Sequence, residues 1–296
     1  MTAGHVPVMS LEALGFLLPE RGGTFVDCTV GLGGHSRAML EAGATRVIGI
    51  DRDEDALAGA RTTLSPWAGR VELVHSDYRA IDSVLDGLNV TLVDGALADL
   101  GVSSMQFDEP GRGFSFQRDE PLDMRMDRSS GETAADFLAR TAEHELADTI
   151  YAYGEERFSR RIARAIVEAR REAPIATTVR LATIVRRAIP RRGYQRIDPA
   201  TRTFQALRIW VNRELDGLDA FLGAMAKRLR VGARLVVITF HSLEDRIVKH
   251  TLRALEKSAD AAVKVLTKKP VVPGDDEIAR NPRARSAKLR AAEKLA

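Results

Sequence analysis

The sequence predicts an α/β protein in which a parallel β-sheet, covered by helices on both faces, is interrupted by a helical insertion. Short apolar segments bounded by turn residues alternate with amphipathic helical segments over the first hundred residues. No strong strand pattern follows between residues 103 and 203, and an apolar strand pattern returns at 232–240. Strands that alternate with helices in this way form parallel sheets whose two faces are both buried.

Four strands are expected in the first part of the chain, each apolar and bounded by turn residues. The first helix is expected to follow a glycine-rich turn and to end at Gly43, because glycine commonly stops a helix. A second helix, "EDALAGARTTL", has apolar residues three and four apart. The expected strands are 24–28, 46–51, 71–77 and one within 90–101.

The middle of the chain loses this alternation. A loop rich in Gly, Pro and Asp at 106–131 precedes helical patterns at 143–153, 157–172 and 177–189, and a long amphipathic helix is expected at 204–229. We therefore expect a discontinuous sheet domain made of residues 1–104 and 204–296, with a helical insertion at 105–203. The charged C-terminal tail is only weakly periodic, and its pattern leaves open whether it docks.

Composition narrows the class of protein. Of the 296 residues, 45% are hydrophobic and 29% are charged, which is ordinary for a globular protein. No apolar run reaches the roughly 20 residues of a membrane span, and the N-terminus does not resemble a secretory signal. Cys28 is the single cysteine, which excludes an internal disulfide, and the histidines show no metal-ligand spacing. We expect a cytoplasmic protein without a membrane partner or bound metal.

Positive charge is concentrated in one segment. Between Tyr151 and Arg213 there are 15 arginines, no lysines and five acidic residues, although the whole chain carries a net charge of only +3. Arg157, Arg160, Arg161 and Arg164 are three or four residues apart, so they share one helix face. The planar guanidinium group matches phosphate geometry. This face is our candidate RNA-binding surface; the alternative is a solvated helix face.

A nucleotide site is predicted where the first strand meets its helix. Gly31, Gly33 and Gly34 allow a tight turn and a close ligand approach, and the helix that follows offers free N–H groups. Asp51 ends the second strand, 18 residues after Gly33, where a carboxylate can accept hydrogen bonds from both ribose hydroxyls. The pattern indicates an adenosine-type ligand.

NAD and S-adenosylmethionine both contain adenosine. The dinucleotide fingerprint requires a third glycine where this chain has Ser36, which disfavours NAD. Asp27, at the end of the first strand, is placed to hold the amine of a methionine moiety. Tyr78 follows the third strand, where an aromatic ring can cover adenine. These features favour S-adenosylmethionine.

Several long motifs resemble one protein family over nearly the whole chain. They are "GLGGHSR" (31–37), "DLGVSSMQFD" (99–108), "RGFSF" (112–116), "PLDMRMD" (121–127), "YGEERFSRRIARAIV" (153–167), "PATRTFQALRIWVN" (199–212), "TFHSLEDRIVK" (239–249) and "NPRARSAKLR" (281–290). On these motifs the chain resembles the bacterial small-subunit ribosomal RNA cytidine-N4 methyltransferases. The resemblance implies the Rossmann-like sheet of class I methyltransferases.

The resemblance also implies an activity and partners. The family uses S-adenosylmethionine to methylate the exocyclic amine of one cytidine in the decoding region of 16S rRNA. An assembled 30S subunit as substrate and a homodimeric state are implied as well. The chain has Tyr78 where relatives often have Phe, and Met105 where many have Pro. The implied cofactor contacts are Gly33, Gly34, His35, Asp51, Tyr78, Asp99 and Gln106.

Two residues are candidates for catalysis. The exocyclic nitrogen of cytosine is a poor nucleophile, and an acceptor for its N–H would help to localise the lone pair. Asp99 follows the fourth strand and can serve the amine, the cofactor or both. His241 follows the strand at 232–240 and can accept a proton, or it can be structural. Ser242 and Glu244 are expected to cap the next helix.

Two other functions remain open from residue patterns alone. One is an NAD-dependent oxidoreductase, which predicts nicotinamide binding. The other is a non-catalytic RNA-binding protein of ribosome assembly that keeps a relic cofactor pocket. Measuring whether the protein binds S-adenosylmethionine or NAD distinguishes a methyltransferase from the oxidoreductase. Transfer of a labelled methyl group to RNA distinguishes a methyltransferase from the non-catalytic RNA-binding protein.

Overall fold

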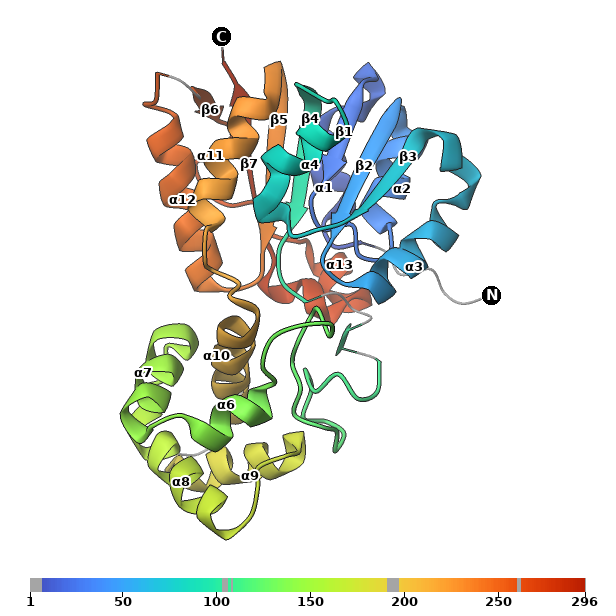
Figure 1. The fold of residues 1–296 in the computed structure, drawn as a ribbon. Helices are drawn as coiled ribbons and strands as arrows, with labels where there is room; N and C mark the ends of the chain where they lie inside the picture. Colours follow the sequence, from blue (N-terminus) through green and yellow to red (C-terminus); the bar gives the residue numbers. More distant parts are fainter. Residues whose placement is uncertain (1–6, 103–105, 108, 191–196, 260–261, 296) are drawn as a thin grey trace. The chain divides into compact units, whose positions relative to one another are not determined.

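The computed structural model describes residues 7–102, 106–107, 109–190, 197–259 and 262–295. The chain divides into two compact units (Figure 1). Residues 1–101 and 217–296 form one, called here the sheet unit, and residues 102–216 form the other, called the helical unit.

The sheet unit contains seven strands in the order β3-β2-β1-β4-β5-β7-β6. The five strands expected from the sequence run parallel to one another. β7 is antiparallel to both of its neighbours. The strand bounds are β1 Thr24–Asp27, β2 Arg46–Asp51, β3 Val71–His75, β4 Val93–Asp99, β5 Leu229–Thr239, β6 Val263–Val265 and β7 Lys288–Lys294.

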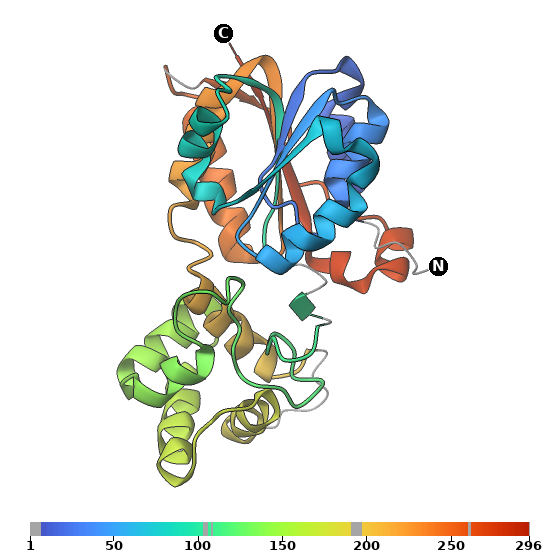
Figure 2. The same ribbon diagram turned by 45° about the vertical axis from the view of Figure 1, so that its right-hand side comes forward.

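Helices cover both faces of this sheet, as the buried strands predicted (Figure 2). Side chains alternate along each strand, so Leu97 of β4 packs into one core while its neighbours Ala96 and Ala98 pack into the other. The first core includes residues of α1 Ser10–Leu17, α2 Gly34–Ala42 and α3 Glu54–Thr63. The second includes residues of α4 Ile81–Gly87, α11 Leu218–Arg228 and α12 Ser242–Leu255.

The long helix expected at 204–229 is in fact two helices, α10 Ala200–Asn212 and α11. Arg213, with φ of 49°, ends α10, and Gly217, with φ of 67°, precedes α11. These left-handed residues break the helix although the apolar spacing continues across them. The chain accordingly returns to the sheet unit at Gly217, later than the expected residue 204. Phe204 and Leu207 pack in the core of the helical unit.

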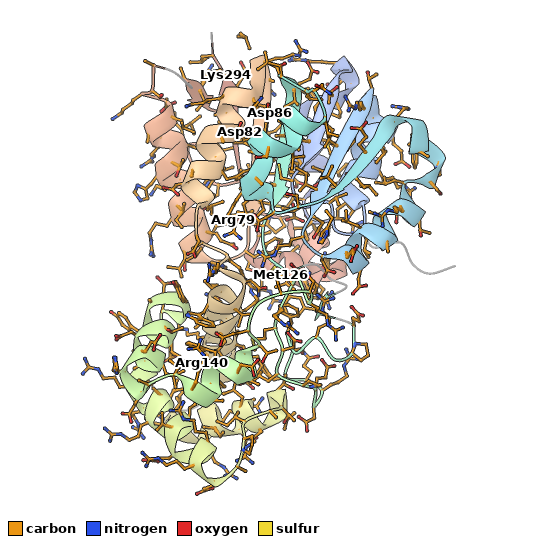
Figure 3. All side chains as sticks on the ribbon, in the orientation of Figure 1. Arg79, Asp82, Asp86, Met126, Arg140 and Lys294 are labelled. Atoms are coloured by element: carbon orange, nitrogen blue, oxygen red, sulfur yellow. The ribbon has the colours of Figure 1, made fainter. Side chains whose placement is uncertain are left out.

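The helical unit has its own apolar core. The three helices expected in the insertion are present as α7, α8 and α9. Asn212 of α10 anchors the preceding loop, since its Oδ1 accepts from the Met126 N–H at 2.8 Å and its Nδ2 donates to the Met124 carbonyl at 2.7 Å (Figure 3). Besides α10, the helices are α6 Ala134–Arg140, α7 Glu143–Gly154, α8 Ser159–Glu172 and α9 Thr178–Ala188.

The C-terminal tail docks, because β7 lies between β5 and β6. Its Arg290 is 5% exposed, and the guanidinium donates to the Asp245 carboxylate of α12 at 2.6 Å. This ion pair lets a charged segment enter the interior of the sheet. Before it, the short helix α13 Asp275–Arg280 lies beside the N-terminal segment, where the Met9 N–H donates to Glu277 Oε1 at 2.6 Å. In the described part of the chain, no helix has the length and apolarity needed to span a bilayer.

Candidate functional site

The candidate site lies where the strand order changes direction. From β1 the chain proceeds outward to β2 and β3, and then returns to β4 on the other side of β1. Neighbouring strand ends at such a switch point leave a crevice at the carboxyl edge of the sheet, which is where open α/β sheets bind ligands. Asp27 ends β1 and Asp99 ends β4, so two carboxylates of the chain meet this edge.

The glycine turn has the backbone geometry that its sequence predicts. Gly33 has φ of 84°, and a Cβ at this position would lie 3.0 Å from Leu64 Cγ. Gly33 is therefore required both by its left-handed conformation and by tight packing. Helix α2 starts at the next residue, and its N-cap, Gly33, has no side chain that could bond the first N–H groups of the helix. These donors remain available to a ligand.

Asp51 holds the glycine turn through its carboxylate. Its Oδ2 accepts from the Gly31 N–H at 2.8 Å, and its Oδ1 accepts from the Asp53 N–H at 2.9 Å. Burial raises the pKa of Asp51 to about 6, and the two N–H donors act in the opposite direction. The carboxylate is thus preorganised by the backbone before any ligand arrives.

Asp27, which we expected to hold the amine of a methionine moiety, is buried and bonded within the protein, and its contact with a ligand stays a prediction. It is 1% exposed; its Oδ2 accepts from Ser36 Oγ at 2.7 Å, and its Oδ1 accepts from the Thr29 N–H at 3.3 Å. Both oxygens are thus engaged inside the protein. Ser36 stands where a dinucleotide fingerprint would have its third glycine, and its hydroxyl ties α2 to the end of β1.

His35 and Asp99 form the polar pair of the crevice. His35 Nε2 lies 3.6 Å from Asp99 Oδ2, and the His35 residue is 6% exposed. His35 Nε2 and Asp99 Oδ1 are buried and make no hydrogen bond to the residues that the structure describes. Burial lowers the pKa of His35, but the carboxylates of Asp99, Asp27 and Glu277 outweigh burial, so this pKa is raised overall. Buried polar atoms normally have partners, so this pair points to a polar ligand.

Tyr78 follows β3 and begins the short 3-10 helix η3, Tyr78–Ala80. Its ring packs edge-on against Phe221 of α11, with ring centroids 4.7 Å apart. Burial raises the pKa of its hydroxyl. The next residue, Arg79, is bound to the Asp77 carboxylate through Nε at 2.8 Å (Figure 3). Contact between Tyr78 and adenine stays a prediction.

His241 is the N-cap of α12. Its Nδ1 accepts from the Glu244 N–H at 3.4 Å, and Glu244 Oε2 accepts in return from the backbone N–H groups of Phe240 and His241. His241 Nε2 lies 3.0 Å from Glu244 Oε1. Capping thus occupies the Nδ1 lone pair, and the cap is His241 where we expected Ser242. The structure provides a structural role for His241, and its catalytic role stays a prediction.

The other predicted residues lie in the helical unit. Gln106 is 4% exposed within it. Arg157 stacks over the Phe158 ring at 4.7 Å, and Arg164 Nε lies 3.6 Å from Glu143 Oε1. All four arginines of the candidate RNA-binding surface are exposed. Arg157 precedes α8, which begins at Ser159 and not at the expected residue 157, so Arg157 does not share the helix face of the other three. Ile162 and Ile166 of α8 are buried. α8 is therefore amphipathic, with its basic face in solvent.

Comparison of the sequence with known proteins identifies the family of this chain. The sequence matches the family model described as the MraW methylase family over residues 2–295. The chain belongs to the MraW methylase family. The ribosomal RNA small subunit methyltransferase H of Sorangium cellulosum is 54% identical over 291 residues, which cover 98% of this chain and 91% of that protein. The protein of the same name from Nitrobacter winogradskyi is 52% identical over 302 residues, 98% of this chain and 90% of that protein.

Solved structures are similar at greater distance. An rRNA methylase from Streptococcus thermophilus has a TM-score of 0.43 and 14% identity, covering 96% of this chain and 95% of that chain. A SAM-dependent O-methyltransferase from Thermotoga maritima has a TM-score of 0.42 and 12% identity, covering 100% of this chain and 69% of that chain. The strand order of this MraW-family protein is that of the Rossmann-like class I methyltransferase sheet expected from the resemblance.

Residues that sequence reasoning missed complete the crevice of this MraW-family protein. Thr29 Oγ1 accepts from the Asp99 N–H at 2.7 Å and so holds the end of β4 against the turn after β1. Glu277 contributes negative charge near His35 from α13. A hydroxyl residue directly after a predicted strand is a usable signal for Thr29. Nothing in the sequence pattern connects Glu277, 242 positions away, with His35.

Proposed function

We propose that this protein transfers a methyl group from S-adenosylmethionine to the exocyclic N4 amine of a cytidine in the decoding region of 16S rRNA. Membership of a methylase family supports methyl transfer, and the names of its relatives support small-subunit rRNA as the substrate. The single structural observation that carries the proposal is the buried, unsatisfied pair His35 Nε2 and Asp99 Oδ1 beside the glycine turn.

The residues of the crevice fit this cofactor. Asp51 accepts the ribose hydroxyls, and the N–H groups at the start of α2 face acceptor atoms. His35 and Asp99 offer polar atoms to the methionine end or to the reacting amine, and Tyr78 covers the adenine. Contact between Gln106 and the cofactor stays a prediction from the resemblance. The dinucleotide alternative is disfavoured because Ser36 is fully buried and bonded to Asp27.

Positioning and electrostatics provide the chemistry. S-adenosylmethionine supplies an already activated methyl carbon on a sulfonium, so the protein has mainly to align the acceptor. Asp99 accepts a hydrogen bond from the cytosine N4–H, which localises the nitrogen lone pair and stabilises the positive charge that develops there. Water exclusion strengthens this interaction, because the local dielectric is low.

The RNA is held mainly through its backbone. The exposed arginines of α8 contact phosphates, and the target cytidine is splayed out of its stack into the crevice. The substrate is the assembled 30S subunit in the cytoplasm, and the enzyme acts as a homodimer.

Two experiments test the proposal. Calorimetric titration with S-adenosylmethionine and with NAD separates the methyltransferase from the oxidoreductase, and only the former ligand is expected to bind. Purified 30S subunits from a strain that lacks this enzyme are then incubated with labelled cofactor, and the modified nucleoside is identified by mass spectrometry. Label in N4-methylcytidine supports the proposal. Cofactor binding without label in RNA would instead favour a non-catalytic assembly protein.

A further inference from the structure

Three elements bring a histidine and two aspartates together at the switch point. Asp27 ends β1, His35 lies in the first turn of α2, and Asp99 ends β4. Asp27 is satisfied by Ser36 and Thr29, whereas the 3.6 Å between His35 Nε2 and Asp99 Oδ2 is too long for a hydrogen bond. The structure therefore contains a buried imidazole nitrogen next to a carboxylate, with neither fully used.

Among the described residues, the charges that shift the pKa of His35 are negative. They are Asp27 from β1, Asp99 from β4 and Glu277 from α13, and together they raise its pKa in spite of burial. An imidazolium at this position is therefore well supported by its surroundings. His35 is thus a proton-accepting group that cofactor contact alone does not explain.

Methylation of an amine releases a proton, which must leave the crevice. The N4–H bond breaks as the N–C bond forms, and the sulfonium becomes a neutral thioether. We propose that Asp99 takes this proton from N4 and passes it to His35 Nε2 once the bound ligands bring the two side chains within hydrogen-bond distance, so that His35 is the terminal proton acceptor. The step conserves charge, because one positive charge leaves the sulfur and one appears on the imidazole. This inference rests on the proposed function.

Electrostatic interaction links the loss of the methyl group from the sulfonium to the protonation of His35. A sulfonium in the crevice disfavours a second positive charge nearby, so it holds His35 neutral and able to accept a proton. When the sulfur becomes neutral that repulsion disappears, and the carboxylates around His35 favour the imidazolium. The protein should consequently bind more protons in its complex with S-adenosylhomocysteine than in its complex with S-adenosylmethionine.

Calorimetry measures this difference without any turnover. Each ligand is titrated into the full-length protein near pH 7 in buffers of different ionisation enthalpy, which yields the number of protons taken up on binding. We expect greater uptake with S-adenosylhomocysteine, loss of the difference in His35→Gln, and its retention in the control His250→Gln, an exposed histidine of α12. Equal proton uptake for the two ligands in the wild-type protein would overturn the inference, whether or not the variant folds.

A kinetic readout separates proton transfer from simple binding. In single-turnover methylation of 30S subunits, His35→Gln is expected to lower the rate at saturating cofactor at least tenfold and to flatten its dependence on pH. A change confined to cofactor affinity would contradict a proton-accepting role. If the proton counts differ but no RNA is methylated, the proposed substrate is wrong and the proton site stands. If RNA is methylated but the counts are equal, the inference alone fails.

Discussion

At the scale of single residues, neighbouring aspartates acquire different properties from their surroundings. Asp27 and Asp99 end adjacent strands, yet Asp27 is closed off by Ser36 and Thr29 while Asp99 keeps a buried oxygen without a described partner. From the sequence we expected both aspartates to contact a ligand. Burial distinguishes the two, because Asp27 is 1% exposed whereas the side chain of Asp99 is 23% exposed.

The raised pKa of Asp51 predicts that cofactor binding depends on pH. Burial raises its pKa to about 6, and ribose hydroxyls favour the ionised form. Affinity is therefore expected to fall as pH drops below about 6, by up to about tenfold per pH unit. Calorimetric titration at pH 5 and pH 7 measures this. Asp51→Asn should bind weakly at both values, and the exposed control Glu54→Gln should behave like wild type; a wild-type affinity that is equal at both values would contradict the assignment.

Asp51 also affects the stability of the ligand-free protein. Its folded pKa is raised above the unfolded value of 3.8, so its stabilising contribution is complete below pH 3.8 and is lost as pH rises through about 6. The ionised carboxylate is therefore kept at some cost to stability.

At the scale of the elements, the ends and the faces of the helices show how far spacing along the sequence predicts the structure. The capping box of α12 uses His241 and Glu244, and the basic face of α8 stays in solvent while its apolar face is buried. The two faces of α8 follow from spacing along the sequence, whereas the sequence predicted Ser242, and not His241, as the cap of α12. Spacing did not reveal the break between α10 and α11, because the backbone conformations of Arg213 and Gly217 leave the apolar pattern unchanged.

His241→Ala is expected to destabilise the protein by about 1 kcal/mol, since it removes a helix cap. His241→Asn should keep most of the wild-type stability, because Asn is a good N-cap residue. Urea unfolding measures both variants, with His250→Ala as the control. If His241→Asn is stable yet does not methylate 30S subunits, the histidine has a catalytic role beyond capping.

Changing Arg160, Arg161 and Arg164 to Ala is expected to weaken binding to 30S subunits and to make the salt dependence shallower. Each lost phosphate contact lowers the slope of log affinity against log salt by about 0.7 to 0.9. Filter binding over a range of salt concentrations measures this. The control removes three exposed cations of the sheet unit, by changing Lys227, Arg253 and Lys257 to Ala. If the affinity and the salt slope of the α8 variant are unchanged, α8 does not contribute to RNA binding.

At the scale of the whole molecule, the C-terminal tail completes the sheet. β7 inserts between β5 and β6, and Arg290 enters the interior with Asp245 as its partner. Burial raises the pKa of Asp245, but Arg290 and Lys288 outweigh it, so this pKa is lowered overall. The stabilisation from this carboxylate is present above its unfolded pKa and is lost as pH falls through the folded value.

Asp245→Asn is expected to destabilise the protein by roughly 3 kcal/mol, because it leaves the Arg290 charge buried without its counter-ion. The double variant Asp245→Asn, Arg290→Met should recover much of this loss. Chemical unfolding at neutral pH measures both proteins. A double variant no more stable than Asp245→Asn would show that packing around β7, and not charge pairing, dominates at this position.

The sequence by itself determined the α/β alternation, the five parallel strands, the glycine turn with Asp51 one strand away, and the amphipathic helices of the insertion. Periodicity and turn chemistry are local, so they can be read along the chain. Only the tertiary structure decided that Asp27 is closed off, that His35 and Asp99 share a crevice, and that the charged tail becomes a strand. His35 and Asp99 are far apart in sequence, as are Arg290 and Asp245, so spacing along the chain could not pair them. The partners of Asp27 are near in sequence, but only the packing of α2 against β1 buries them together.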